Sequence, residues 1–434
     1  MNQDLWQRAN RSIPSGNMLL SKHPDIHLPD AWPTYYERAE GCKVWSVDGN
    51  EYIDMGIMGI GTNSLGYSNK FVNEKVIEAI GKSNMSSLNC PEEIYLAERL
   101  VELHPWADQV KFARTGGEAN ALAIRVARAA TGRDTVAVCG YHGWHDWYLA
   151  ANIKDDASLE EHLMPGLAPE GVPKALAGSV LTVRFNDFDA LEWVFKSHSL
   201  AAFKLEVQRN APPAKGYLER VRELCDKAGT ILVFDECTSG FRETFGGIHL
   251  KTSISPDMAV FGKALGNGFA ITAVIGKDSV MDSAKRTFIS STFWSERIGF
   301  VAGLATLEEM ERLRSWTMIT ELGSYLLSAW EDMAAAVGLS INIGTLPAIA
   351  TFGFNSERHL AYKTYFTQEL LASGYLGGCL VFLSTAHTKE VIDRYCERAF
   401  EIFTSIKTFE IEGVPESEFL NGPKCRTPFT RLND

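Results

Sequence analysis

The sequence predicts an α/β fold built around a mostly parallel, doubly wound sheet, and two observations support this. Between about residues 110 and 295, short apolar runs alternate with stretches of helical periodicity. The runs are apolar throughout rather than at every second residue, which suits parallel strands covered by helices on both faces. The expected strands are QVKFA (109–113), TVAVCG (135–140), SVLTVRF (179–185), LAAFKLE (200–206), ILVFDE (231–236), DMAVFGK (257–263) and ITAVIG (271–276).

Helices are expected between these strands. Apolar residues in 119–130 recur at i, i+3 and i+4, the spacing of one helix face. Residues 218–228 form a second predicted helix, and Gly229 is placed where a left-handed residue ends it. In such a fold, ligands bind at the carboxyl ends of the strands.

The two ends of the chain have a different pattern, with short strands such as AIATFGF (348–354) and CLVFLS (379–384) and a helix over 388–404. We therefore expect a large domain at 51–325 and a smaller α+β domain formed jointly by residues 1–50 and 326–434. The Gly- and Pro-containing tail after Thr404 is expected to be an extended arm.

Composition excludes several classes of protein. The 434 residues carry a net charge of −12 without clusters of Lys and Arg, which argues against nucleic-acid or anionic-membrane partners. No apolar stretch approaches the length of a transmembrane helix, and the start has no secretory pattern, so a cytoplasmic protein is expected. The eight cysteines show no CxxC or zinc spacing and are interpreted as reduced thiols.

A lysine and an aspartate end two of the expected strands. Lys263 closes DMAVFGK before a Gly-rich turn, and Asp235 lies at the end of ILVFDE. Burial would lower the pKa of such a lysine and make its amine nucleophilic, as Schiff-base chemistry requires. The pair suggests pyridoxal phosphate, with Lys263 bound to it and Asp235 holding its ring nitrogen protonated. A snorkelling lysine and a structural ion pair of the aspartate are the alternatives.

A phosphate would need its own binding site. Thr115, Gly116 and Gly117 lie where QVKFA turns into the next helix, so backbone N–H groups and the helix N-terminus could hold an anion. The alternative is a turn that needs glycines for conformation only. The loop YHGWHD (141–146) offers aromatic rings that could stack on a planar cofactor. Its histidines could instead be metal ligands, but no distant third ligand is evident, and no metal is expected.

Several longer motifs follow one another along residues 5–405, and with them the chain resembles the class III aminotransferases of the fold-type I pyridoxal-phosphate enzymes. Within that family it is similar to the glutamate-1-semialdehyde aminomutase branch. The motifs are IPSG (13–16), VWSVDGNEYIDM (44–55), FARTGGEANALAIRVARAATGRD (112–134), YHGWHD (141–146), DECTSGFR (235–242), SPDMAVFGKALGNG (255–268) and STAHT (384–388).

The resemblance implies roles around the cofactor ring. Lys263 matches the lysine that binds the cofactor and moves the proton, and Asp235 matches the acid on the ring nitrogen. Cys237 stands where the family usually has a valine on one face of the ring. Tyr141 matches the aromatic residue on the other face, with His142 beside it.

Further roles follow for the phosphate and the substrate. Thr115, Gly116 and Gly117 match the phosphate turn, and Thr292 matches the threonine that reaches the phosphate from the partner subunit, so a homodimer with composite active sites is implied. Glu206 matches the strand-end acid near the ring oxygen and the substrate. Lys22 aligns with the arginine that binds the substrate carboxylate.

The resemblance implies a transaminase that takes an amino group from an amino acid, L-glutamate by analogy. The aminomutases have a longer loop with a glutamate before the AHT motif, whereas GYLGGCLVFLSTAHT (374–388) is shorter and has no acid. Because members of the branch include sugar aminotransferases, the expected acceptor is a keto-sugar such as the 8-keto-octulosonate of lipopolysaccharide synthesis. The alternatives are an ω-amino-acid transaminase, a glutamate-1-semialdehyde aminomutase and, against the evidence of Lys263, a non-enzymatic binding paralogue.

Overall fold

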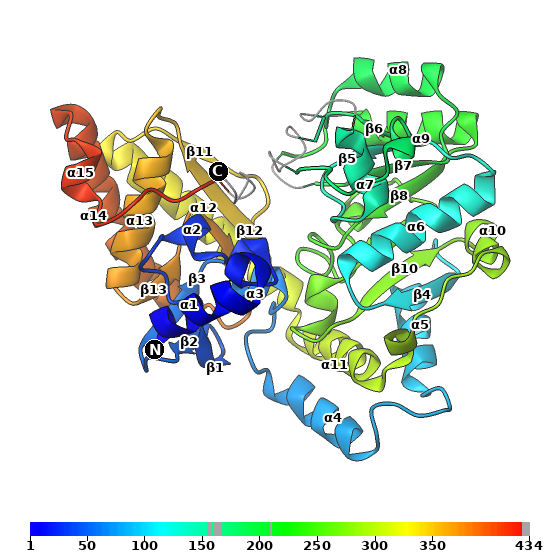
Figure 1. Cartoon of the computed structure of the whole chain (residues 1–434), viewed down its shortest axis with the longest axis horizontal. Coiled ribbons are helices and arrows are strands. Elements are labelled where there is room, and N and C mark those ends of the chain that lie inside the picture. Colours follow the sequence, from blue (N-terminus) through cyan, green and yellow to red (C-terminus); the bar gives the residue numbers. More distant parts are fainter. Residues whose placement is uncertain (154–157, 160–166, 209–210, 428–434) are drawn as a thin grey trace. The chain divides into compact units, whose positions relative to one another are not determined.

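The structure is a computed structural model that describes residues 1–153, 158–159, 167–208 and 211–427. The chain divides into two compact units (Figure 1). Unit 1 joins Met1–Asn69 to Thr317–Asp434, and unit 2 consists of Lys70–Trp316.

These boundaries differ from the expected ones at 50/51 and 325/326. The first lies further along the chain because β3 (Glu51–Met55) pairs with β2 (Lys43–Ser46), so the chain stays in unit 1 beyond residue 50. The second lies earlier because α12 (Ser315–Val337) is one continuous helix that begins at the boundary and belongs almost entirely to unit 1.

Unit 2 contains a seven-stranded sheet in the order β4-β10-β9-β8-β7-β5-β6. The pairs from β9 to β6 are parallel, and β10 runs antiparallel to both β9 and β4. The mostly parallel sheet and the seven expected strands are therefore confirmed. The strands are β4 (Gln109–Ala113), β5 (Val136–Cys139), β6 (Val180–Thr182), β7 (Ala202–Glu206), β8 (Ile231–Asp235), β9 (Met258–Phe261) and β10 (Thr272–Gly276).

Helices cover this sheet, and α6 lies across it in contact with β4, β10, β9 and β8 (Figure 1). The α-helices of unit 2 are α4 (Lys70–Gly81), α5 (Glu92–Leu103), α6 (Gly116–Thr131), α7 (Asp146–Leu149), α8 (Phe188–Ser197), α9 (Tyr217–Ala228), α10 (Asp278–Met281) and α11 (Arg297–Leu313). The 3-10 helices are η3 (Ala150–Asn152), η5 (Lys174–Leu176), η6 (Ile248–Lys251), η7 (Lys263–Gly266), η8 (Asp282–Arg286) and η9 (Thr292–Ser295). Gly229 ends α9 at φ 60°, as the sequence predicts.

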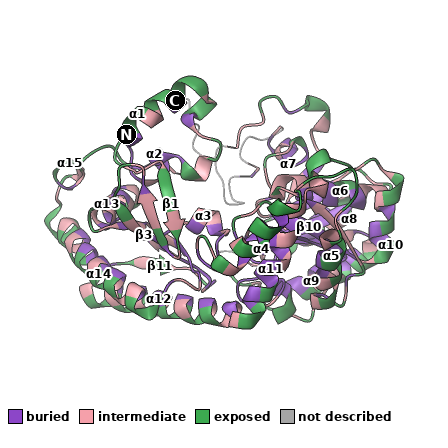
Figure 2. Ribbon diagram, turned by 90° about the horizontal axis from the view of Figure 1, so that it is seen from below, coloured by how far each residue is buried: buried purple, intermediate pink, exposed green. Residues whose placement is uncertain are grey.

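Unit 1 has a sheet in the order β1-β2-β3-β13 and a smaller one in the order β11-β12-β14. The remaining strands are β1 (Tyr36–Glu40), β11 (Ile341–Ile343), β12 (Ile349–Phe354), β13 (Tyr375–Gly377) and β14 (Leu380–Phe382). The helices are α1 (Asn2–Ser12), η1 (Pro14–Gly16), η2 (Leu20–Lys22), α2 (Pro24–His27), α3 (Met58–Gly61), α12, α13 (His359–Ala372), α14 (Lys389–Glu412) and α15 (Glu416–Phe419). Edge strand β1 is mostly exposed (Figure 2). The unit 2 strands β5 and β7, in contrast, are buried throughout.

The expected extended arm after Thr404 is wrong. Helix α14 continues to Glu412, because Ile406 keeps the apolar face going and is fully buried, and Phe409 packs against the same core. Gly413 then ends the helix in a left-handed conformation at φ 67°. Among the described residues, none of the helices has both the length and the apolar character needed to cross a membrane.

Candidate functional site

Two acids end neighbouring strands of the large sheet. Glu206 and Asp235 are partners in the register of β7 and β8, so their side chains lie on one face, and both are buried. Asp235 accepts hydrogen bonds from the backbone N–H of Cys237 (3.1 Å) and pairs with Nδ1 of His142 (2.8 Å). Burial opposes ionisation of Asp235, but the charge of Lys204 and the His142 contact outweigh it and hold its pKa below the ordinary value.

Lys263 begins η7, separated from the end of β9 by Gly262, and is half-buried. Its φ is 43°, a left-handed conformation that side-chain-bearing residues rarely adopt and that occurs preferentially at functional sites. Its Nζ donates a hydrogen bond to Oγ1 of Thr238 at 2.7 Å. The turn of Cys237 and Thr238 therefore contacts both strand-end groups, Asp235 through an N–H and Lys263 through a hydroxyl.

Helix α6 begins at Gly116 behind a complete capping box. The Thr115 side chain accepts from Glu118 N–H, and the Glu118 carboxylate accepts from Thr115 N–H. No hydrogen-bond acceptor is found among the described residues for the N–H groups of Gly116 and Gly117, the first residues of the helix. A free helix N-terminus of this kind favours an anion.

The 140–146 loop packs against that helix start. A Cβ on Gly117 would lie 2.7 Å from the ring of His145, which itself stacks on Trp144. Tyr141 N–H donates to the Glu206 carboxylate at 3.0 Å. Gly140 has φ 120°, and a Cβ there would lie 2.7 Å from Glu206, so only glycine lets the loop pass over this acid.

The thiol of Cys237 lies between two glycines. A Cβ on Gly116 would be 3.6 Å from its sulfur, and a Cβ on Gly262 would be 3.4 Å from it. Burial raises the pKa of Cys237 well above its ordinary value, so the sulfur is a neutral thiol. Cys237, the residue expected on one face of the ring, thus lies beside both the start of α6 and Gly262, the residue before Lys263.

The structure does not bring every expected residue to this place. Thr292 is exposed at the start of η9, in a segment attached through Arg114, which donates to the carbonyls of Phe293 (2.8 Å) and Trp294 (3.1 Å). Lys22 belongs to unit 1, where it is exposed at the end of η2.

Two further polar residues at the site escaped the sequence reasoning. Thr238 holds the Lys263 amine, and Lys204 is fully buried on β7 with its Nζ 3.7 Å from Oδ2 of Asp235. A lysine inside the otherwise apolar run LAAFKLE was the available signal for the second. Across the described residues, His, Cys, Asp and Glu side chains form no group of three or more that could hold a metal ion.

Comparison with known proteins identifies the family of the chain. Residues 28–390 match the family described as Aminotransferase class-III. The chain is 32% identical over 381 residues to the 3-aminobutyryl-CoA aminotransferase of Cloacimonas acidaminovorans, covering 84% of this chain and 87% of that one. It is 31% identical over 424 residues to the glutamate-1-semialdehyde 2,1-aminomutase of Methanothrix thermoacetophila, covering 92% and 96%.

The crystal structure of an omega-transaminase from Sphaerobacter thermophilus superposes with a TM-score of 0.83 at 26% identity, over 94% of this chain and 98% of that one. The fold is thus that of the fold-type I transaminases. The chain belongs to the class III aminotransferases and is a pyridoxal-phosphate-dependent transaminase.

Proposed function

We propose that unit 2 binds pyridoxal phosphate at the start of α6 and beside the 237–238 turn, and that Lys263 transfers the proton of the amination reaction. The observation that best supports this proposal is the position of the 237–238 turn. Its Cys237 N–H donates to Asp235, and its Thr238 hydroxyl accepts from the Lys263 amine. It keeps the acid and the amine in a fixed relation on neighbouring strands.

The residues present fit this cofactor. Its phosphate needs N–H donors, which Gly116 and Gly117 supply at the free N-terminus of α6. Its ring nitrogen needs a buried anion, and Asp235 is 3% exposed and held ionised by its neighbours. Cys237 and Tyr141 offer an apolar thiol and an aromatic ring for its two faces.

Bound pyridoxal phosphate supplies the electron sink that no amino-acid side chain provides. The protein's own part is to hold the proton on the ring nitrogen with Asp235 and to move a proton at the substrate carbon with the Lys263 amine. The strained backbone of Lys263 and its bond to Thr238 aim that amine. The Glu206 carboxylate accepts a hydrogen bond from the backbone N–H of Tyr141 and so positions that residue. We propose that Glu206 also faces the ring oxygen and the substrate.

The test is Lys263→Ala, with Lys227→Ala as a matched control at an exposed position on α9. We expect Lys263→Ala to abolish turnover and the attachment of cofactor to protein, and the control to retain both. Mass spectrometry after borohydride reduction should find the cofactor on Lys263 in the parent protein. Attachment at another lysine, or unchanged turnover in Lys263→Ala, would overturn the assignment.

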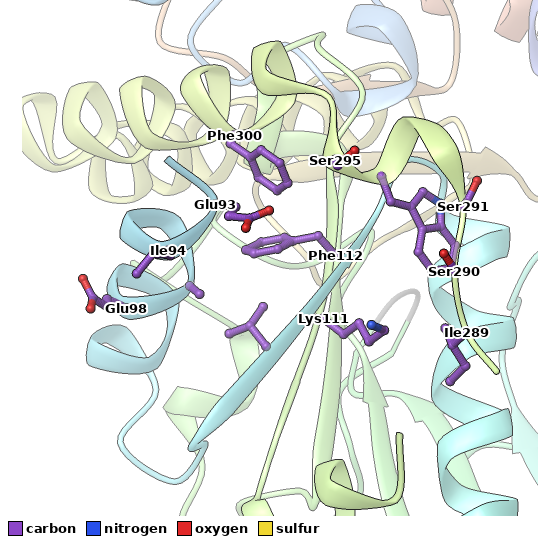
Figure 3. Close-up of a pocket in the computed structure, with 13 residues that line it drawn as sticks. Glu93, Ile94, Glu98, Lys111, Phe112, Ile289, Ser290, Ser291, Ser295 and Phe300 are labelled. Atoms are coloured by element: carbon purple, nitrogen blue, oxygen red, sulfur yellow. The ribbon is translucent and has the colours of Figure 1, made fainter. Parts of the chain in front are cut away.

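We also propose a homodimer in which Thr292 of each chain completes the site of the other. A cavity of about 430 Å³ opens between α5, β4 and residues 289–295, with Phe112 and Phe300 toward it (Figure 3). Unit 2 also exposes large apolar side chains that would be costly to leave in water. They include Ile77, Leu88, Ile94, Tyr95, Phe288 and Phe293, each more than half exposed.

The dimer is tested by Phe288→Asp combined with Leu88→Asp. Buried charges should disfavour association, so sedimentation velocity should find the parent protein as a dimer and the variant as a monomer. Thr292→Ala should weaken cofactor binding without changing the sedimentation coefficient. A monomeric parent protein would contradict both proposals.

For the acceptor we propose a keto-sugar acid, such as an 8-keto-octulosonate of lipopolysaccharide synthesis, with L-glutamate as amino donor. The support is the segment 374–388, which has small residues at Gly374, Gly377 and Gly378 and no acid, together with an exposed lysine, Lys22, that could attract a carboxylate. An acidic side chain there would repel an anionic sugar, and its absence permits one.

A second candidate is a β- or ω-amino compound as substrate. It is favoured by the similarity to a 3-aminobutyryl-CoA aminotransferase and to an omega-transaminase structure. An aminomutase activity is the third, by similarity to the Methanothrix protein.

One experiment separates the three. The enzyme is converted to its amino form with glutamate, freed of donor, and offered keto-sugars, ω-aldehyde acids or glutamate-1-semialdehyde, and return of the original spectrum is measured. The sugar proposal expects recovery with keto-sugars only. Recovery only with ω-aldehyde acids would support the second candidate, and turnover of the semialdehyde without any donor would support the third.

A further inference from the structure

The inference concerns Lys204, a lysine within the central strand β7. The strand is buried at every residue, and Lys204 itself is 0% exposed. Its Nζ lies 3.7 Å from Oδ2 of Asp235, which is an ion-pair distance but too long for a hydrogen bond. Within the described part of the chain, Nζ has no hydrogen-bond acceptor.

A buried ammonium group without hydrogen bonds is unusual, because it loses its hydration and gains little in return. Burial lowers the pKa of Lys204, and the charge of Asp235 opposes that change. The other ionisable groups that act on it are Cys237 and Glu206, and Lys204 in turn acts on His142. Asp235 is the nearest anion, so the two side chains form one electrostatic unit.

That unit lies where the proposed function puts the cofactor ring, and the inference rests on that function. Asp235 then has two cationic neighbours, the Lys204 ammonium and the protonated ring nitrogen, while its other contacts are His142 and Cys237 N–H. Like charges this close disfavour each other. We propose that Lys204 and the ring nitrogen compete for Asp235, so that Lys204 weakens the hold on the ring proton.

Two consequences follow from the competition. A ring nitrogen that gives up its proton more readily withdraws electrons less strongly, so Lys204 sets the strength of the electron sink as a positioning residue. Coupling between two sites is reciprocal, so protonation of the ring nitrogen must lower the proton affinity of the Lys204 amine by the same factor. Loading the cofactor therefore lowers the fraction of Lys204 that carries its proton, and the protons lost go to the solvent buffer.

The test loads the apoenzyme with pyridoxal phosphate carrying ¹⁵N in the ring and follows the nitrogen shift by NMR across pH. Lys204→Met removes the charge at nearly constant volume, and Lys227→Met makes the same change at an exposed position. We expect the pH of half-protonation to rise by about one unit in Lys204→Met, a roughly tenfold tighter hold on the proton, and to stay unchanged in Lys227→Met.

Asp235→Asn separates this inference from the function on which it rests. If Asp235→Asn lowers the half-protonation pH while Lys204→Met leaves it unchanged, the competition is wrong and the site assignment stands. If neither variant changes it, the site assignment itself fails.

A second measurement does not depend on the spectrum of the loaded enzyme. Protons released when apoenzyme binds pyridoxal phosphate are counted with an indicator dye, and the parent protein should release more than Lys204→Met, with one proton per site as the limit. Equal release would overturn the proposal. If Lys204→Met does not fold, Lys204→Gln takes its place. We expect the same rise in the pH of half-protonation and the same smaller release of protons in that variant.

Discussion

Each of the two units buries an aspartate at a strand end, and the two treat its charge in opposite ways. Asp54 on β3 and Asp235 on β8 are both 3% exposed. Asp54 has neutral neighbours, the hydroxyl of Tyr67 (2.6 Å) and Gly56 N–H (3.0 Å), and burial raises its pKa to about 6. Asp235 has a cationic neighbour, Lys204, and a hydrogen bond with His142, and its pKa is lowered.

The difference teaches that burial alone does not decide the state of an acid. Desolvation raises the pKa of both carboxyls, and the outcome depends on whether a positive charge lies within reach. In the small unit the charge of Lys22 and the hydrogen bonds to Asp54 do not offset its burial, so the proton binds more tightly. The large unit places Lys204 and His142 beside its acid and so keeps a permanent anion inside the protein.

The strongest way to break this comparison is to neutralise each acid in turn. Asp235→Asn should lower kcat/KM on the order of 10²-fold or more, because a charge prearranged at the reacting centre is lost. Asp54→Asn should keep kcat/KM close to that of the parent protein. Steady-state kinetics with saturating cofactor measures both, and equal losses in the two variants would remove the distinction.

The next effect concerns stability against pH in unit 1. Between the ordinary pKa of 3.8 and about 6, Asp54 is ionised in the unfolded chain but protonated in the folded one. The folded state then binds more protons, so the stability contributed by this group falls as pH rises through that window, by about 3 kcal/mol.

Calorimetry on parent protein and Asp54→Asn over this pH range checks the prediction. The variant has no carboxyl to titrate, so across this window its free energy of unfolding should fall by about 3 kcal/mol less than that of the parent protein, whatever its absolute value. Parallel curves for the two proteins would mean that Asp54 does not titrate as described.

A smaller effect compares two left-handed glycines, one in each unit. Gly140→Ala combines strain at φ 120° with a Cβ placed 2.7 Å from Glu206, whereas Gly374→Ala adds strain at φ 84° with open space around it. We expect Gly140→Ala to cost about 2–3 kcal/mol and Gly374→Ala about 1 kcal/mol. Denaturant unfolding gives both values, and the reverse order would contradict the close packing over Glu206.

The smallest expected effect is that of Lys22→Ala. An exposed charge contributes roughly 0.2–1 kcal/mol, so KM for an anionic acceptor should rise about 1.4-fold to fivefold with kcat unchanged. Arg11→Ala, at another exposed cation of unit 1, is the control and should leave KM as it is. A rise in both would point to the general field of the protein rather than to a contact of Lys22.

The sequence predicted the strands of unit 2 well, because continuous apolar runs bounded by glycines and polar residues are distinctive. Asp235 and Lys263 were visible for the same reason, since each interrupts such a run at its end. The full length of α14 was missed because the polar residues after Thr404 hid the buried face that Ile406 continues.

Contacts across strands were beyond the sequence. The meeting of Lys204 with Asp235 depends on the register of β7 against β8, which no local pattern specifies. The bond from Lys263 to Thr238 likewise depends on how two separate turns meet. Thr292 and Lys22 could be named only by resemblance, and their roles stay predictions.

The split of unit 1 between the two chain ends has a consequence for biosynthesis. β3 forms part of its sheet with β13, pairing Ile53 with Tyr375, and a ribosome makes all of unit 2 between these two strands. Strands β1, β2 and β3 can pair with one another, but the edge of β3 that receives β13 must wait while the central unit folds as a body of its own. A nascent chain stopped near Trp316 would carry the complete sheet of unit 2 and a three-stranded piece of unit 1 with one open edge, a surface on which chaperones could act.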